Sequence, residues 1–184
     1  MSGSETIAAP RDAVWAGLND PAVLKQCIPG CDSITKDSPT SMTAKASIKL
    51  GPVKASFTGK VTLSDLKPPE SYRISGQGQG GLAGFASGSA AVRLTAISAE
   101  ETQLDYDVDA QVGGKIAMLG SRLIDATAQS LSKQFFTKFA NAVKAKAAAA
   151  PKPAAPAPKK AAAKKPVKKS APKAPTKKAA KKKK

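Results

Sequence analysis

The sequence predicts an α+β fold, in which a curved antiparallel β-sheet wraps around one long C-terminal helix. Three observations lead to this fold class. Residues from Gly113 to Val143 carry one continuous helical pattern, residues from Ser33 to Ala110 alternate between apolar and polar, and the composition changes abruptly after Val143. We therefore expect one folded domain over residues 1–143, followed by a disordered basic tail over residues 144–184.

The predicted C-terminal helix has an apolar side chain at every third or fourth position along its whole length. Its opposite face is polar, and we expect Arg122 and Asp125 to form a local ion pair there. A helix of this length spans roughly 45 Å, so a broad surface has to cover its apolar face. That face consists of Ile116, Leu119, Leu123, Thr127, Leu131, Phe135, Phe139 and Val143.

The N-terminal segment predicts a short strand and two short helices. The strand covers residues 4–9, and Pro10 opens the first helix because proline suits the first helical turn. Trp15 lies on this amphipathic helix and is expected in the core. The run Asn19-Asp20-Pro21 ends it and opens a second helix over residues 22–26, and a turn over residues 27–31 leads into the sheet.

The middle of the chain predicts consecutive strands in an antiparallel meander, with turns at residues 51–52, 68–69 and 100–101. In each strand, alternate residues face inward. The predicted inward residues are Met42, Ala44, Ala46, Ile48 and Leu50; Ala55, Phe57, Gly59, Val61 and Leu63; Tyr72, Ile74, Gly76 and Gly78; Ala90, Val92, Leu94 and Ala96; and Leu104, Tyr106, Val108 and Ala110.

Many of these inward positions hold Ala or Gly where a packed core would hold larger side chains. Because interiors pack at about 0.74 density, undersized residues either draw the helix onto the sheet or leave a void. We favour a void that binds an apolar ligand, since an apolar concavity is the usual form of a ligand site. The side chains expected to line it are Phe57, Tyr72, Phe85, Tyr106, Leu119, Leu123 and Phe135.

The segment 76–81, GQGQGG, matches the G-x-G-x-x-G spacing of dinucleotide-binding loops. That motif requires a helix to begin at its third glycine, and a strand-like segment follows here instead. We therefore expect a strongly curved strand and a flexible loop that gates the pocket. The gate residues are Gly80, Gly81, Leu82, Gly84 and Gly88.

Residues suited to catalysis are scarce. The chain contains no histidine, which excludes imidazole triads, histidine metal sites and histidine pH switches. Cys27 and Cys31 have a C-x3-C spacing that fits neither a redox motif nor a zinc ribbon, so we expect two reduced thiols. The acids Asp105, Asp107 and Asp109 share one solvent-facing side of a strand. We expect no metal, no catalytic residues and no enzymatic activity.

Positive charge is concentrated after Val143. Of the thirty basic residues, sixteen lysines lie there without any acid, so the predicted domain is nearly neutral although the chain carries +17. Such a composition cannot bury enough apolar surface to fold, apart from a helical extension up to Pro151. The lysines expected to bind a partner are Lys159, Lys160, Lys164, Lys165, Lys168, Lys169, Lys177, Lys178, Lys181, Lys182, Lys183 and Lys184.

Two partners fit this tail: an anionic membrane surface and nucleic acid. The tail composition is similar to that of linker-histone tails, but the nearly neutral domain offers no base-reading element. At about 1 kcal/mol per lysine, a few lysines would hold the protein on an anionic leaflet. The chain shows neither a membrane span nor a secretion signal, so we expect a cytoplasmic protein that is peripheral on the cytoplasmic membrane.

Several motifs together are distinctive: residues 19–21 (NDP) with 27–31 (CIPGC), the glycine-rich segment 76–88, residues 113–115 (GGK), residues 119–124 (LGSRLI) and Phe135-Phe136. With these motifs the chain resembles the CoxG-like family, named after the G-type accessory protein of carbon monoxide dehydrogenase, which belongs to the START-like (SRPBCC), helix-grip superfamily. The resemblance covers nearly all of residues 1–143 and implies a strand, two small helices, six strands and a gripped C-terminal helix.

The resemblance also implies a function. Members of the family are accessory proteins associated with molybdenum-containing carbon monoxide dehydrogenase and related hydroxylases, and they are linked to recruiting the enzyme to the membrane. The superfamily favours apolar ligands, so a bound quinone, menaquinone or ubiquinone, is expected. Two alternatives are a nucleic-acid-associated protein and an enzyme of the polyketide cyclase type, which occurs in the same superfamily.

Overall fold

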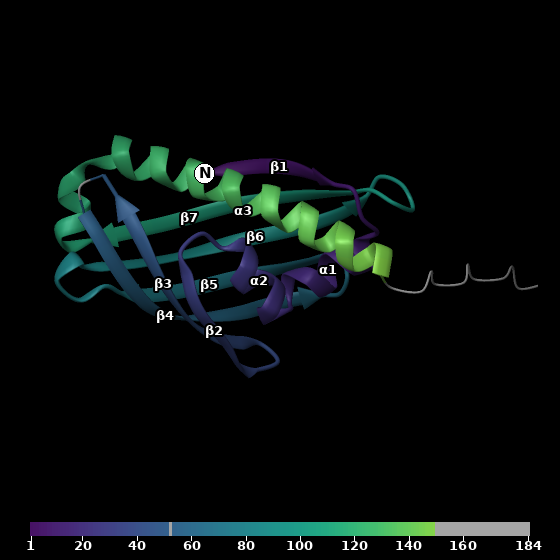
Figure 1. Cartoon of the computed structure of the whole chain (residues 1–184), viewed down its shortest axis with the longest axis horizontal. Helices are drawn as coiled ribbons and strands as arrows, with labels where there is room; N and C mark the ends of the chain where they lie inside the picture. Colours follow the sequence, from purple (N-terminus) through teal and green to yellow (C-terminus); the bar gives the residue numbers. More distant parts are fainter. Residues whose placement is uncertain (52, 150–184) are drawn as a thin grey trace, which may run out of the picture. The chain divides into compact units, whose positions relative to one another are not determined.

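A computed structural model, which describes residues 1–51 and 53–149, shows a long helix lying across one face of a seven-stranded antiparallel sheet (Figure 1). This arrangement confirms the predicted fold class. The elements are β1 (Ser2–Ile7), α1 (Arg11–Leu18), α2 (Pro21–Cys27), β2 (Cys31–Ser38), β3 (Ser41–Leu50), β4 (Val53–Lys67), β5 (Ser71–Gln79), the 3-10 helix η1 (Gly81–Ala83), β6 (Phe85–Ala96), β7 (Thr102–Gly113), the 3-10 helix η2 (Gly114–Leu119) and α3 (Ser121–Ala149).

The sheet order is β1-β7-β6-β5-β4-β3-β2, so strands β2 to β7 form the predicted meander. Strand β1 completes the sheet by pairing antiparallel with β7, with Ile7 opposite Thr102. At this corner the buried Thr102 hydroxyl donates a hydrogen bond of 2.8 Å to the carbonyl oxygen of Ala9. The first strand of the chain is thereby fixed beside the last one.

Helix α3 begins later than its sequence pattern predicts. Residues 114–119 form η2, and Gly120 then adopts φ +85°, a left-handed conformation that favours glycine and separates η2 from α3. A 3-10 turn and an α-helix share a spacing of three residues, so the apolar periodicity did not reveal this break. At its other end α3 continues past Val143 to Ala149, as the alanine-rich extension predicts.

The C-terminal half of α3 packs into the core. Phe139 and Val143 are fully buried, and the ring of Phe135 stacks on that of Phe139 at 5.5 Å between centroids. Helix α1 crosses here at Gly17, where a Cβ atom would lie only 2.7 Å from Val143 Cγ2. A glycine at this crossing lets the two helices approach closely.

The ends of α2 and α3 are joined by Asp20. Its Oδ1 atom accepts a hydrogen bond of 2.9 Å from the Ala22 N–H and so caps α2, and its Oδ2 atom accepts one from Lys146 Nζ of α3. The hydrogen bond from Lys146, followed by that from the Ala22 N–H, lowers the pKa of Asp20. The other ion pairs of the described residues are Arg11–Glu70 and Arg73–Asp65. The predicted pair between Arg122 and Asp125 is therefore wrong.

Replacing Asp20 with Ala is expected to destabilise the fold by about 1 kcal/mol at pH 7, the usual contribution of a helix cap. Because folding lowers the pKa of Asp20, this contribution is present above its ordinary value of 3.8 and is lost as the pH falls through the folded-state value. Urea unfolding of the wild type and Asp20→Ala at pH 7 and pH 3 measures it. The exposed Asp12, in the first turn of α1, provides the control Asp12→Ala. A difference between wild type and Asp20→Ala that is equal at both pH values would contradict the prediction.

None of the described helices is long and apolar enough to cross a membrane. The lysines expected to bind a partner, from Lys159 to Lys184, lie outside the described residues.

Candidate functional site

A cavity of about 470 Å³ lies between the sheet and the first half of α3. We call it the open chamber, because most side chains around it are half-buried rather than buried. Its floor is the central part of the sheet, where the register aligns small residues of neighbouring strands: Gly59 opposite Gly78, and Gly76 opposite Gly88. Its roof is formed by Ile116 of η2 and by Ile124, Thr127, Ala128 and Leu131 of α3.

The small inward residues singled out in the sequence form this floor. Ala44, Ala46, Gly59, Gly76, Gly78, Ala90 and Ala110 all line the open chamber, whereas Ala55 is buried outside it. The helix therefore does not lie directly on the small residues, and the space left by the missing side chains remains empty of protein atoms.

A second cavity of about 310 Å³, the inner chamber, continues under the middle of α3 toward α1 and α2. The two chambers adjoin, because Ala44, Val61, Ile74, Ala90 and Val108 line both. Together they form an elongated apolar space along the helix axis. The inner chamber is closed by larger side chains, namely Leu18, Leu24, Ile28, Ile34, Met42, Leu63, Tyr72, Val92, Leu104, Tyr106, Phe135 and Phe136.

Four of the seven predicted lining residues lie in the walls of these chambers. Phe57 lines the open chamber, and Tyr72, Tyr106 and Phe135 line the inner one. Their contact with a ligand stays a prediction.

The other three predicted lining residues, Phe85, Leu119 and Leu123, do not line either chamber. Phe85 is 46% exposed at the start of β6, and Leu123 lies against Gly51 in the turn between β3 and β4. The helix break at Gly120 changes which residues face the sheet, so that Ile124 occupies the place predicted for Leu123. Leu119 belongs to η2, whose buried residue is Ile116.

The predicted gate loop is shorter than expected. Residues 80–84 form the connection between β5 and β6, with η1 at its centre, whereas Gly88 lies within β6 and pairs with Gly76 and Ala110. No helix begins at the third glycine of the G-x-G-x-x-G match, so the structural context of a dinucleotide site is missing. Leu82 is 87% exposed and does not close over the cavity.

Sequence reasoning missed the lining residues that come from α1 and α2, and it missed Phe136. The alternating pattern placed Met42, Leu63 and Ile74 on the inward face but could not show that they surround a cavity. Phe136 stacks on Tyr106 at 5.0 Å between ring centroids. These two rings and Ser132 separate the inner chamber from a polar groove between β1 and α3. The stacked pair therefore closes this side of the cavity.

The two chambers offer few groups for catalysis. Asp109 is the only acidic residue in their lining, and it is an exposed residue of β7. Two hydroxyl groups, those of Tyr72 and Ser132, belong to residues of the inner chamber. Burial raises the pKa of Tyr72, so its phenol stays protonated at neutral pH and can donate a hydrogen bond.

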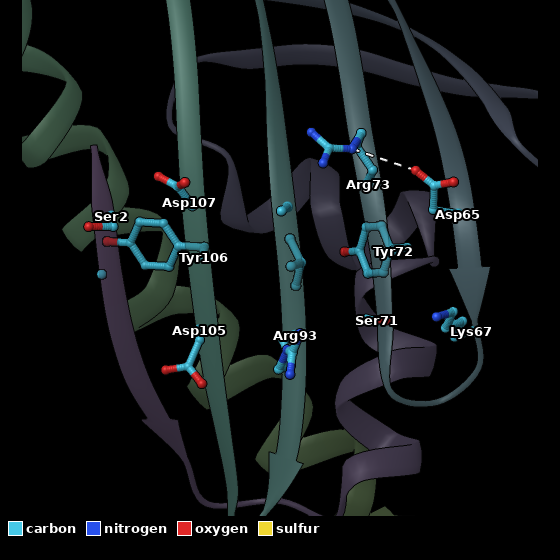
Figure 2. A pocket seen from close by; sticks show the side chains of 13 residues that line it. Ser2, Asp65, Lys67, Ser71, Tyr72, Arg73, Arg93, Asp105, Tyr106 and Asp107 are labelled. Atoms are coloured by element: carbon cyan, nitrogen blue, oxygen red, sulfur yellow. Dashed lines mark ion pairs between the residues drawn. The ribbon is translucent and has the colours of Figure 1, made fainter.

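A hollow of about 560 Å³ on the other face of the sheet has a different character (Figure 2). Arg73, Arg93, Asp105 and Asp107 line it, and they alternate along their strands with residues that line the inner chamber. Arg73 Nε lies 3.6 Å from Asp65 Oδ2. Hydrogen bonds from Gln103 and Ser4, together with the charge of Arg93, lower the pKa of Asp105. These are exposed, mutually compensated charges, as the sequence predicted for the acids of this strand, and exposed pairs contribute little energy.

Cys27 and Cys31 are both free thiols, with Cys27 buried and Cys31 half-buried. Burial raises the pKa of both, which keeps them protonated and unreactive at neutral pH. In the described part of the chain, no three His, Cys, Asp or Glu residues are grouped so that they could hold a metal ion.

A sheet that grips a long C-terminal helix above an elongated apolar cavity defines a START-like, helix-grip domain. Solved structures share this fold. A START superfamily protein from Mycobacterium smegmatis aligns with a TM-score of 0.56 at 15% identity, covering 77% of this chain and 97% of that one. The ZhuI aromatase/cyclase from Streptomyces sp. R1128 aligns with a TM-score of 0.57 at 17% identity, covering 78% and 92%.

The chain belongs to the carbon monoxide dehydrogenase G-subunit (CoxG) family, whose model matches residues 3–144. A conserved protein from Geobacillus kaustophilus is similar over the same domain, with 33% identity, a TM-score of 0.73, and coverage of 78% of this chain and 94% of that one. A comparison with curated proteins found no match. Family and fold together indicate an accessory or ligand-binding role, and the family name associates its members with carbon monoxide dehydrogenase.

Proposed function

We propose that this protein is a non-catalytic accessory protein that binds an isoprenoid quinone, menaquinone or ubiquinone, between the sheet and α3. It recruits a molybdenum-containing carbon monoxide dehydrogenase, or a related hydroxylase, to the cytoplasmic membrane through its polybasic tail. The observation that carries the proposal is the pair of adjoining apolar chambers under α3 in a member of the CoxG family.

The shape and chemistry of the chambers support a chain-like apolar ligand with a polar head. The lining residues of α3 run from Ile124 to Phe136, a path of about 18 Å along the helix. Apolar walls on the sheet side and the helix side favour the transfer of a hydrocarbon chain by roughly 25 cal/mol per Å² removed from water. The hydroxyls of Tyr72 and Ser132 can donate hydrogen bonds to a carbonyl group of the head.

The residues around the cavity support a carrier rather than an enzyme. The chain has no histidine, and the lining offers neither an acid pair nor a nucleophile with an adjacent base. The similarity to an aromatase/cyclase is at 17% identity and concerns the fold alone.

Ligand binding can be measured with the chain's own tryptophan. Trp15 lies edge-on against Tyr72 at 5.2 Å between ring centroids, beside the inner chamber. Titration with a short-chain menaquinone or ubiquinone is expected to quench its fluorescence with saturation and to raise the melting temperature, since a ligand that binds only the folded state stabilises it. Mass spectrometry of lipids extracted from gently purified protein should identify the natural ligand. Absence of quenching, of stabilisation and of any extracted lipid would refute the ligand part of the proposal.

Recruitment can be tested with vesicles and DNA in parallel. The full chain should sediment with phosphatidylglycerol vesicles at low salt and be released as salt rises, because exposed charges are screened. Binding to duplex DNA but not to vesicles would instead support the nucleic-acid alternative. Purified molybdenum hydroxylase should co-sediment only when this protein is present.

A further inference from the structure

The two most exposed large apolar side chains of the described residues lie at the same end of the molecule. Leu82 of η1 is 87% exposed and Met118 of η2 is 85% exposed. The two 3-10 helices pack against each other: a Cβ atom on Gly84 would lie 1.9 Å from the carbonyl oxygen of Gly113. Figure 1 shows this end on the left, where β6 and α3 begin and β7 ends.

Basic residues surround this apolar pair. The turn between β3 and β4 reaches the same end, because Gly51 lies against Leu123 near the start of α3. The segments that meet here, residues 48–58, 79–91 and 110–124, contain no acidic residue. We call this end the tip and define it by Leu82, Met118 and the exposed residues Lys49, Lys54, Lys115 and Arg122.

The tip is also the end wall of the open chamber. In η2 the side chain of Ile116 is 2% exposed and lines the chamber, whereas Met118, two residues later, faces solvent. In the same way Phe57 lines the chamber, and its ring lies against Gly80 beside η1. Thin segments of chain therefore separate the apolar cavity from the two exposed apolar side chains.

We propose that the tip docks on an anionic lipid bilayer, with Leu82 and Met118 inserted among the acyl chains and the basic residues at the headgroups. The open chamber then faces the lipid from which its ligand enters. This inference rests on the proposed function for the nature of the ligand, but it adds a docking surface on the folded domain that does not depend on the tail.

The chemistry of the tip fits a bilayer better than a protein partner. Stable protein interfaces bury about 800 Å² on each partner around a contiguous apolar centre, whereas here two apolar side chains project from short glycine-flanked turns. A ring of cations without acids matches the negative surface potential of an anionic leaflet.

The test uses the full chain and removes apolar character without changing side-chain size. The variant Leu82→Gln/Met118→Gln is compared with Ile97→Gln, which changes a 53% exposed residue just after β6, at the opposite end of that strand. Binding to phosphatidylglycerol/phosphatidylcholine vesicles is measured by sedimentation at low salt and at a salt concentration that screens the lysines. At high salt we expect the double variant to bind roughly tenfold more weakly than the wild type, and Ile97→Gln to bind like the wild type.

Insertion depth provides a second readout. In the variant Met118→Trp, vesicles with brominated acyl chains should quench the new tryptophan, whereas Trp15 of the wild type, which lies in α1 away from the tip, should not be quenched. Equal binding of the wild type and the double variant, together with no quenching of Met118→Trp, would overturn docking by the tip and leave recruitment by the tail intact. Failure of the wild type to bind vesicles at any salt concentration would overturn both, while the quinone titration separately reports on the cavity.

Discussion

Replacing Ala90 with Phe is expected to abolish ligand binding, with at least about a hundredfold loss of affinity for a short-chain quinone. Ala90 lies on the floor where the two chambers meet, so a phenyl ring there occupies the space required by the ligand. The fold should tolerate this change because the ring enters an existing void and buries apolar surface. Quenching of Trp15 measures the affinity, and thermal unfolding measures the stability.

The neighbouring residue provides a matched control for Ala90→Phe. Ala91 is exposed, lines the hollow on the other face of the sheet and lies opposite Arg73 and Asp107 in the register. Ala91→Phe adds the same ring to the same strand without reducing the cavity, so quinone affinity should stay at the wild-type value. Equal affinity of Ala90→Phe and Ala91→Phe would show that the ligand does not occupy the chambers.

Replacing Phe139 with Ala is expected to cost about 3–5 kcal/mol of stability and to lower the melting temperature by roughly 10 °C. Phe139 is fully buried, stacks on Phe135 and lies against Gly17 of α1, so truncation leaves a cavity where α3 is anchored. Denaturant unfolding followed by circular dichroism measures the loss.

The control for Phe139→Ala is Phe85→Ala, which removes the same ring from a 46% exposed position and should cost no more than about 1 kcal/mol. Similar losses for the two variants would show that α3 is not held at Phe139. In that case the cavity, whose roof is the first half of the same helix, would lack a fixed support.

The two ends of α3 have different tasks, and this division explains the small residues of the sheet. Near the C-terminal end, large side chains such as Phe139 fix the helix to α1 and to the core. Near the other end, Gly76, Gly88 and Ala90 keep the sheet from filling the space beneath it. A voided core is less stable than a packed one, so a ligand that fills the chambers is expected to stabilise the domain.

The sequence by itself determined the elements and their inward faces. Alternation with a period of two placed Ala44, Gly59 and Val108 on the concave side, and the structure has them in the chamber walls. The family motifs likewise identified the fold. These signals are local, since each depends on residues close together in the chain, and local patterns persist whatever the rest of the molecule does.

Only the tertiary structure decided which parts distant in sequence meet. The pairing of β1 with β7, the contribution of Leu18 and Leu24 to the inner chamber, and the juxtaposition of Leu82 with the η2 segment all join residues far apart in the chain. The break at Gly120 replaced Leu123 with Ile124 at the cavity, because one residue with a left-handed φ redirects the helix that follows. Such contacts depend on the packing of all elements together, which no single stretch of sequence encodes.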